Sequence, residues 1–403
     1  MTHTLISFLG RVPKGENGYR TTRYQFDDVL DEPTAFIGWS LRRHLNPDRM
    51  VILGTAGSMW DHLFEKDFVL GSVAEDERLA LQVATETKTV TEELLEPLMP
   101  ILTQRLGCEV RLVLIPYCQN ELEQLELLRL MAAEVNPGDQ VNLDVTHGFR
   151  HLPMLAMLSA LHLKEVKKAE IAGVWYGLYD HDTKEAPVYN LGGLLRIADW
   201  LGALHTFDKD GDYGVFADLM EKDGAPTYQA NYLRRAAFRE RTSNAYEACT
   251  DLKNLDTVLK SGLPGVSALF NDQLRERIRW HRGQNLRAWQ RELAIEYLER
   301  GDYVRSVIFA LEGFETSLVD RENNEEEWNF SHREKAVEEY WDGLRGPQAL
   351  RENYAFLNGL RNALAHGTRP KDSKLGRKIE RTLSDPKLLQ EELRRLIKKL
   401  LPR

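Results

Sequence analysis

The residues best suited to chemistry lie in the segment 358–367, which reads Asn-Gly-Leu-Arg-Asn-Ala-Leu-Ala-His-Gly. On a helix of about 100° per residue, Asn358, Asn362 and His366 recur every fourth position and form a polar stripe, with Arg361 at its edge. Imidazole exchanges protons near neutral pH and guanidinium stabilises developing phosphorane charge, so this group could cleave a phosphodiester. The pattern also fits a polar surface stripe whose histidine interacts with the helix dipole.

The polar stripe requires a helix, and the surrounding residues predict one. The side opposite the stripe is apolar, and Gly367 is a typical helix end. Apolar residues spaced three and four apart also predict helices over 291–300, 303–320 and 352–365, with a turn at Gly301-Asp302. We therefore expect an all-α C-terminal region whose core side carries five residues of the motif helix, namely Phe356, Leu357, Leu360, Ala363 and Leu364.

A second motif, Asp144-Val-Thr-His-Gly-Phe-Arg150, lies where an expected strand ends and a helix begins. Open parallel sheets bind ligands at this position, and the helix start, the Thr146 hydroxyl, His147 and Arg150 would suit phosphates or adenine edges. A capped turn, with Asp144 or Thr146 bonded to backbone amides, is the alternative interpretation. The loops 10–19 and 54–58 follow two other strands and could converge on the same ligand.

The elements of the first half alternate between strands and helices. Short apolar runs predict strands at 4–10, 50–54, 109–115, 141–145 and 171–176, and amphipathic segments predict helices at 121–134 and 152–164. The fold class is thus an α/β Rossmann-like N-terminal domain with a parallel sheet, followed by an all-α C-terminal domain. We expect domains at 1–198 and 291–403 with a helical connecting region at 199–290, and a turn or linker at 208–212.

Composition narrows the functional classes. The 403 residues carry 53 Lys plus Arg against 62 Asp plus Glu, a formal charge of −9, which argues against coating nucleic acid through bulk charge. The segment 370–403 is locally basic, with eleven Lys or Arg against five Asp or Glu. Three cysteines without a CxxC pair are typical of a reducing cytoplasm, and no run approaches a membrane span. His147 and His151 are four residues apart and could share a helix face as metal ligands, but the sequence has no third ligand with suitable spacing, so we expect no metal site.

Two family resemblances connect these motifs. Arg361-Asn362 followed by His366, near the end of an all-α region, resembles the active-site motif of HEPN ribonucleases. Asp144-Val-Thr-His-Gly148 resembles the signature of CRISPR-associated proteins with an N-terminal nucleotide-sensing CARF domain, and the strand Ile6 to Gly10 is similar to that group's opening strand. Together the resemblances imply a CARF-HEPN effector of type III CRISPR defence.

The resemblance implies a cytoplasmic, metal-independent endoribonuclease that is activated by a cyclic oligoadenylate, with cyclic tetra-adenylate as first choice and cyclic hexa-adenylate as second. His366 would be the general acid or base, Arg361 would stabilise the phosphorane, and Asn362 would orient single-stranded RNA; the stripe adds Asn358. The activator would be bound by the CARF dimer through a set of eight residues, Gly10, Arg11, Thr55, Ser58, Thr146, His147, Gly148 and Arg150.

A homodimer also follows from the helix geometry, because Arg361 and His366 lie about 140° apart on one helix and two copies would enclose a phosphate better than one. Two other functions stay open. The α/β domain could be a ring nuclease that cleaves cyclic oligoadenylate, with Thr146 or Ser58 positioning the scissile phosphate. Alternatively, the protein could be a non-enzymatic nucleotide-responsive regulator whose helical domain only dimerises.

Overall fold

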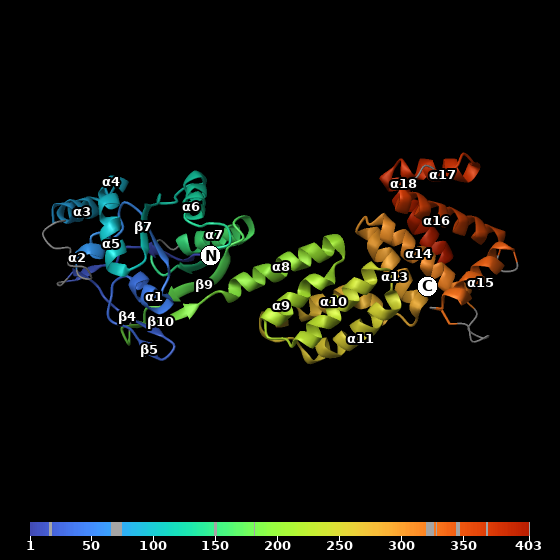
Figure 1. Ribbon diagram of the computed structural model, residues 1–403, viewed down its shortest axis with the longest axis horizontal. Coiled ribbons are helices and arrows are strands. Elements are labelled where there is room, and N and C mark those ends of the chain that lie inside the picture. The colour runs from blue at the N-terminus through green and yellow to red at the C-terminus, as the bar shows by residue number, and fades with distance from the viewer. Residues whose placement is uncertain are drawn as a thin grey trace. The chain divides into compact units, whose positions relative to one another are not determined.

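The computed structural model describes residues 1–15, 18–65, 75–148, 151–180, 182–319, 326–327, 329–343, 347–367 and 370–402. The chain divides into two compact units, Met1–Leu195 and Arg196–Arg403. The first is α/β and the second is helical (Figure 1).

An eight-stranded mixed sheet forms the centre of the N-terminal unit, in the order β5-β4-β10-β9-β8-β1-β6-β7. Two further short strands, β2 (Lys14–Gly15) and β3 (Gly18–Tyr19), form a separate hairpin. The strands of the main sheet are β1 (His3–Leu9), β4 (Arg23–Phe26), β5 (Val29–Leu30), β6 (Arg49–Gly54), β7 (Glu109–Leu114), β8 (Gln140–Asp144), β9 (Glu170–Gly177) and β10 (Glu185–Asn190).

Strands β9, β8, β1, β6 and β7 run parallel, as the sequence predicts, with Ile6 of β1 between Val51 of β6 and Leu143 of β8. The expectation of a purely parallel sheet is wrong at one edge. Strand β10 pairs antiparallel with β9, since the short connection 178–184 allows a hairpin but not a crossover. Strand β4 then extends this edge parallel to β10.

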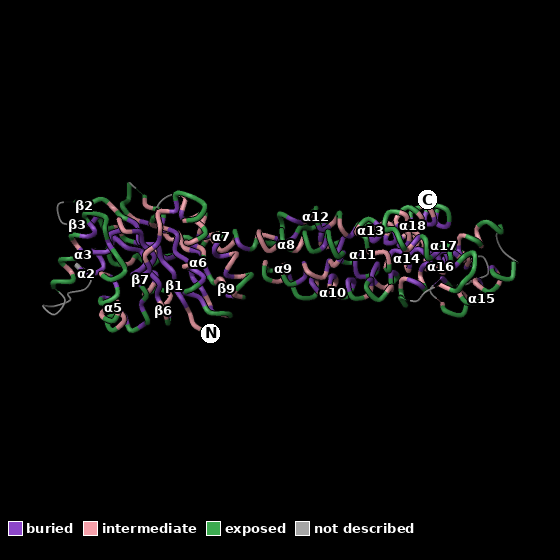
Figure 2. Tube along the Cα trace, turned by 90° about the horizontal axis from the view of Figure 1, so that it is seen from above, coloured by how far each residue is buried: buried purple, intermediate pink, exposed green. Residues whose placement is uncertain are grey.

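Helices cover both faces of the sheet, since successive side chains of a strand point to opposite faces. Leu5 and Leu9 of β1 pack with α1 (Ile37–Leu45), α3 (Glu75–Thr87) and α5 (Met99–Leu106). On the other face, Ile6 and Phe8 pack with α6 (Glu121–Ala133) and α7 (Leu152–Val166). Figure 2 shows the buried strands enclosed by helices with exposed outer sides. This unit also contains two short α-helices, α2 (His62–Glu65) and α4 (Glu92–Leu95), and a 3-10 turn at Glu96–Leu98.

The C-terminal unit has one continuous hydrophobic core, which extends from Trp200 to Leu401. The predicted turn at Gly301-Asp302 joins two of its helices, and the Asp302 carboxylate accepts a hydrogen bond of 2.9 Å from the Arg305 amide. Its described α-helices are α8 (Gly193–Asp210), α9 (Ala217–Lys222), α10 (Thr227–Arg241), α11 (Ala245–Ser261), α12 (Asn271–Arg277), α13 (Leu286–Glu299), α14 (Tyr303–Leu318), α15 (Phe330–Trp341), α16 (Gln348–His366), α17 (Lys374–Leu383) and α18 (Pro386–Leu400).

The domain bounds expected from the sequence stay predictions, and both the expected boundary and the division after Leu195 lie within one helix. The boundary at 198/199 falls inside α8, which starts at Gly193, and the helices of 199–290 share the core of the helices after 291. The segment 208–212 ends α8 and starts a turn, in which the Asp212 carboxylate accepts a hydrogen bond of 2.9 Å from the Gly214 amide. The separate roles proposed for the three segments stay predictions.

Candidate functional site

A pocket of about 310 Å³ opens at the carboxyl ends of the parallel strands. The order of the strands reverses at β1, because β6 and β7 follow on one side of it and β8 and β9 on the other. The carboxyl edge beside such a reversal is where α/β sheets place ligands. The lining residues come from the ends of four of these strands and from two helix ends, and comprise Phe8, Leu9, Gly10, Arg11, Leu53, Thr55, Gly57, Ser58, Lys88, Ile115, Tyr117, Gly148 and Leu152.

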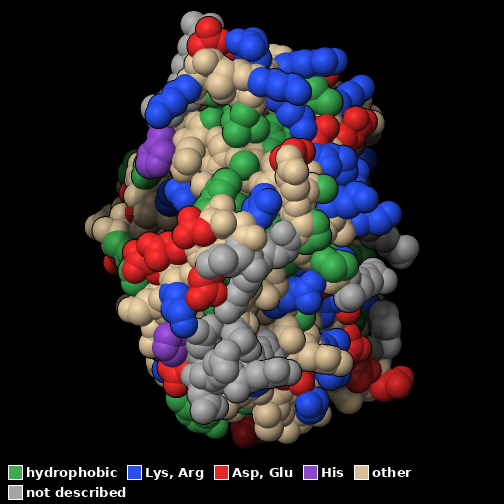
Figure 3. All heavy atoms as spheres, turned by 90° about the vertical axis from the view of Figure 1, so that its right-hand side faces the viewer, with side chains coloured by type: hydrophobic (Ala, Val, Ile, Leu, Met, Phe, Trp, Pro, Cys, Tyr) green, Lys and Arg blue, Asp and Glu red, His purple; other side chains and the backbone are tan. Residues whose placement is uncertain are grey.

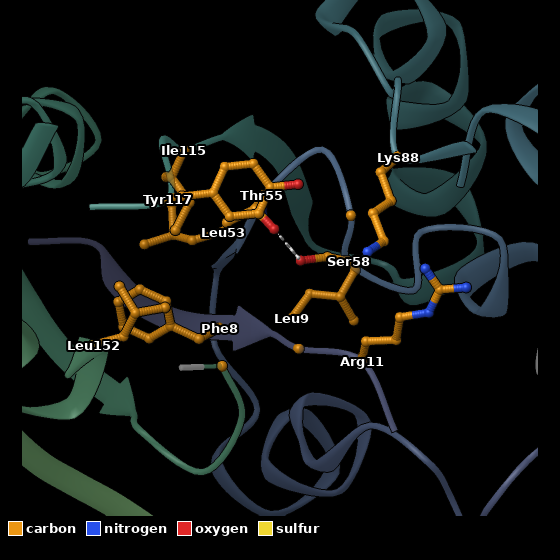
Figure 4. Close-up of a pocket in the computed structure, with 13 residues that line it drawn as sticks. Phe8, Leu9, Arg11, Leu53, Thr55, Ser58, Lys88, Ile115, Tyr117 and Leu152 are labelled. Atoms are coloured by element: carbon orange, nitrogen blue, oxygen red, sulfur yellow. Dashed lines mark hydrogen bonds between the residues drawn. The ribbon is translucent and has the colours of Figure 1, made fainter. Parts of the chain in front are cut away.

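The pocket has an apolar side and a cationic side. Figure 4 shows Phe8, Leu152 and Ile115 on one side and the charged groups of Arg11 and Lys88 on the other. An apolar wall can stack a base, while two cations can neutralise phosphate groups. The arrangement therefore fits a nucleotide better than an uncharged apolar molecule.

The Thr55–Ser58 turn forms the polar centre of the pocket. The Ser58 hydroxyl accepts a hydrogen bond of 2.9 Å from the Thr55 amide and lies 3.3 Å from the Thr55 hydroxyl (Figure 4). The Trp60 indole donates to the Thr55 carbonyl at 2.9 Å, and a Cβ on Gly54 would come within 2.5 Å of that ring. The two hydroxyls are thus positioned by a turn that is itself fixed by packing.

Lys88 is a pocket residue that the sequence analysis missed. It follows α3 in the left-handed region, with φ of 59°, and its stem comes within 3.4 Å of where a Cβ on Gly57 would stand. Arg11 is held from the same direction by a hydrogen bond of 3.3 Å to the Thr85 carbonyl. No motif surrounds Lys88 in the sequence. Its place beside Arg11 in the pocket is therefore visible only in the fold.

Thr146 and His147, which we expected in the same pocket, line a neighbouring cavity of about 350 Å³. The Thr146 hydroxyl accepts a hydrogen bond of 2.9 Å from the Gly177 amide. The His147 Nε2 lies 3.3 Å from the Tyr24 hydroxyl, and burial lowers the pKa of its imidazole to about 4, with a smaller effect from the charge of His62. His147 is therefore neutral at physiological pH.

Asp144 is a buried residue at the end of β8, directly before the loop that carries Thr146 and His147. Its carboxylate is fully buried, accepts a hydrogen bond from the Ser7 hydroxyl and accepts a second, of 2.9 Å, from the Thr146 amide. Burial raises the pKa of Asp144 to about 6, against the opposing effect of these hydrogen bonds. This bonding fits the capped-turn interpretation of Asp144, and it fixes the loop that carries the other motif residues.

The eight residues expected to bind the activator thus divide into three sets. Five of them, Gly10, Arg11, Thr55, Ser58 and Gly148, line the first pocket, and Thr146 and His147 line the second. Arg150 lies outside the described residues. His151, the other histidine considered as a metal ligand, has its Nε2 at 3.2 Å from the Tyr117 carbonyl.

The second candidate site is the C-terminal half of α16. Phe356, Leu357, Leu360 and Ala363 are buried and Leu364 packs against the same core, as the helical periodicity predicts. Asn362 and His366 are exposed, and Gly367 ends the helix with φ of 61°. These are the positions that the sequence analysis assigned to the polar stripe.

The other two stripe residues are half-buried. The Asn358 side-chain oxygen is enclosed and has no hydrogen-bond partner within the described part of the chain. Burial raises the pKa of the Tyr354 phenol, and the charge of Arg361 acts in the opposite direction. The Tyr354 hydroxyl donates a hydrogen bond of 2.8 Å to Glu315. Arg361 thus lies near the pair formed by Tyr354 and Glu315.

The described residues contain neither a candidate metal cluster nor a candidate membrane-spanning helix. Among them no group of three or more His, Cys, Asp and Glu side chains is arranged to hold a metal ion. No helix within these ranges is both long and apolar enough to cross a bilayer.

The mixed sheet and the pocket at its strand reversal define an α/β ligand-binding domain. Residues 4–182 match the family model described as CRISPR system endoribonuclease Csx1, CARF domain. The chain is also 25% identical over 288 residues to CRISPR-associated protein MJ1674 of Methanocaldococcus jannaschii. That alignment covers 64% of this chain but only 45% of the relative. Both findings show that the N-terminal part of this chain is similar to CRISPR-associated proteins, and residues 4–182 are similar to a CARF domain.

Proposed function

We propose that this chain is an endoribonuclease of the HEPN type that is switched on by a cyclic oligoadenylate, in type III CRISPR antiviral defence. The observation that carries the proposal is the first pocket, which places two cations and two hydroxyls opposite an apolar wall at the strand reversal of a CARF domain. Cyclic tetra-adenylate is the first choice of activator and cyclic hexa-adenylate the second.

Cleavage would take place at the α16 stripe without a metal ion. The ribose 2′-hydroxyl attacks the adjacent phosphorus, the 2′-oxygen–phosphorus bond forms, and the bond to the 5′-oxygen breaks. His366 either takes the 2′-proton or gives a proton to the 5′-oxygen, and water carries the other of these two protons. Arg361 stabilises the charge on the phosphorane, and Asn358 and Asn362 orient the RNA. The products are a 2′,3′-cyclic phosphate and a 5′-hydroxyl, so DNA, which lacks the 2′-hydroxyl, is not cleaved.

A homodimer would complete both sites. Arg361 and His366 are five residues apart on α16, which corresponds to about 140° around the helix, so two copies related by a two-fold axis would surround one phosphate. The activator would span two N-terminal pockets in the same way. A tenfold activation requires only about 1.4 kcal/mol of preference of the activator for the active dimer.

The test is cleavage of a fluorescent single-stranded RNA in EDTA, with cyclic tri-, tetra- or hexa-adenylate or none, by wild-type protein and by Arg361→Ala and His366→Ala variants. We expect cleavage with one ring size and a loss of about 100-fold or more in each variant. Equal cleavage by the variants would refute the catalytic assignment. Equal cleavage with and without every ring would refute the sensor, and chromatography of the rings would detect a ring nuclease.

A further inference from the structure

Helix α17 carries a cationic face opposite its buried face. Lys374, Arg377, Lys378 and Arg381 follow the spacing i, i+3, i+4, i+7, which places four exposed cations on one side of a helix about 15 Å long. The buried residues of α17, among them Ile379, lie on the opposite side. The helix therefore presents a continuous cationic surface, whereas the whole chain has a formal charge of −9.

This helix lies against α16, the helix of the polar stripe. A Cβ on Gly359 would come within 2.4 Å of the Ile379 Cδ1, so the two helices pack tightly beside Asn358. The Lys378 ammonium lies 3.9 Å from the centre of the Phe356 ring. Only the segment 367–373 connects the helices, so α17 begins near the His366 end of α16 and returns along it. The cationic surface thus belongs to a helix that packs against the helix of the stripe.

Most of these cations have no acidic neighbour that would neutralise them. Arg377 forms an exposed ion pair with Asp372 at 2.6 Å, whereas Lys374 and Arg381 have no carboxylate within 4.0 Å in the part of the chain that the structure describes. Figure 3 shows basic side chains gathered on the upper part of this end of the helical unit, where α17 lies in Figure 1. Unneutralised cations on one face match a polyanion.

We infer that the cationic face of α17 binds the phosphate backbone of single-stranded RNA and leads the strand to the α16 stripe. This inference rests on the proposed ribonuclease function, since it names the surface that would hold the substrate. Lysine and arginine contacts to phosphates position a nucleic acid without reading its sequence. The surface would therefore bind single strands of any sequence, with an affinity that falls as salt is added.

The test measures RNA binding apart from cleavage. In the full-length His366→Ala protein, binding of a fluorescent 20-nucleotide RNA is followed by anisotropy at several salt concentrations, with and without cyclic tetra-adenylate. Lys374→Gln, Arg377→Gln and Arg381→Gln are combined in one variant, and Lys378 is kept because it contacts Phe356. We expect the dissociation constant to rise at least tenfold and the salt slope to fall by about 2.

The matched control combines Lys209→Gln, Lys222→Gln and Lys399→Gln, three exposed lysines on other helices, and changes the net charge equally. We expect this control to bind RNA within twofold of the parent. Equal weakening in both variants, or no RNA binding by the parent, would overturn the inference. The RNA-binding test can be distinguished from the cleavage test. A His366→Ala protein that still cleaved RNA would refute the proposed active site, but the comparison of RNA binding between the two variants would still hold.

Discussion

Gly10 and Gly148 approach each other so closely that a Cβ on Gly10 would stand 2.7 Å from the Gly148 amide nitrogen and 3.1 Å from the His147 Cβ. Gly10 directly follows β1, and Gly148 lies in the loop after β8, with φ of 107°. The contact therefore joins the two loops at the strand reversal. The contact leaves no room for a side chain at position 10, while the positive φ of Gly148 favours glycine at position 148.

Gly10→Ala should damage the sensor. The added methyl group meets backbone rather than a movable side-chain end, so we expect a loss of about 1–3 kcal/mol of stability and a weaker response to the activator. Thermal unfolding and the activator concentration for half-maximal RNA cleavage would measure both. Gly202→Ala is the control, because its Cβ would meet nothing within 4 Å inside helix α8, and it should stabilise the protein by about 0.5–1 kcal/mol.

The central sheet could be predicted because each strand is a short apolar run that ends in a turn. The expected strand at 141–145 is β8 at Gln140–Asp144, and the expected helix at 121–134 is α6 at Glu121–Ala133. Strand β10 was missed because Glu185–Asn190 contains a proline and only one fully buried residue, Ala186. Its place in the sheet depends on pairing with β9, which no local pattern indicates.

The candidate sites show the same limit. The α16 stripe is local, so a helical projection placed Asn362 and His366 at exposed positions and Leu360 in the core. The ligand pocket is not local, since it combines loops that are far apart in the sequence. Motif position indicated five of its residues, but it could not separate Thr146 from Ser58, which line different cavities, and it missed Lys88.

Lys88→Gln should reduce the sensitivity to the activator. A hydrogen bond to a charged group contributes about 1.5–3 kcal/mol, so loss of the ammonium should raise the activator concentration for half-maximal cleavage about tenfold or more. Lys168→Gln is a close control, because both lysines are exposed and have left-handed backbones, with φ of 59° and 54°. The Lys168 variant should respond like wild type. Equal responses of the two variants would remove Lys88 from the ligand site.

The pH dependence of the N-terminal unit should contain two opposing contributions. Burial raises the pKa of Asp144 to about 6, so its contribution to stability is present below about 4, its unfolded value, and is lost as the pH rises through about 6. Burial lowers the pKa of His147 to about 4, so its contribution is present above about 6.5 and is lost as the pH falls through about 4. Between these values the two partly cancel.

Single substitutions should separate the two contributions. Asp144→Asn removes the stability that the protein loses as the pH rises through about 6, so the variant should be more stable at pH 7, on the order of 2–3 kcal/mol at most. Because the effect of His147 is then unopposed, the loss of stability toward low pH should become steeper. His147→Gln should make the acid-side loss shallower. Hydrogen exchange of the β8 amides, corrected for intrinsic rates, would follow both between pH 4.5 and about 7.5. Parallel curves for wild type and both variants would contradict the assignment.

The contact between Gly359 and Ile379 should determine where α17 lies beside the stripe. Gly359→Ala places a Cβ 2.4 Å from the Ile379 Cδ1, and Ile379 is only 4% exposed, so we expect a loss of about 1–3 kcal/mol. Ile379→Val removes that methyl group and should cost about 0.5–1.5 kcal/mol alone. In the double variant the clash is gone, so its destabilisation should be smaller than the sum of the two.

Urea unfolding of the two single variants and the double variant gives this coupling directly, with the pair Gly202→Ala and Ile379→Val as the additive reference for distant sites. RNA cleavage adds a functional readout. If α17 holds the substrate beside His366, the KM for RNA should rise in Gly359→Ala and return toward the wild-type value when Ile379→Val is added. Recovery of stability without recovery of the KM would show that the position of α17 matters for packing alone.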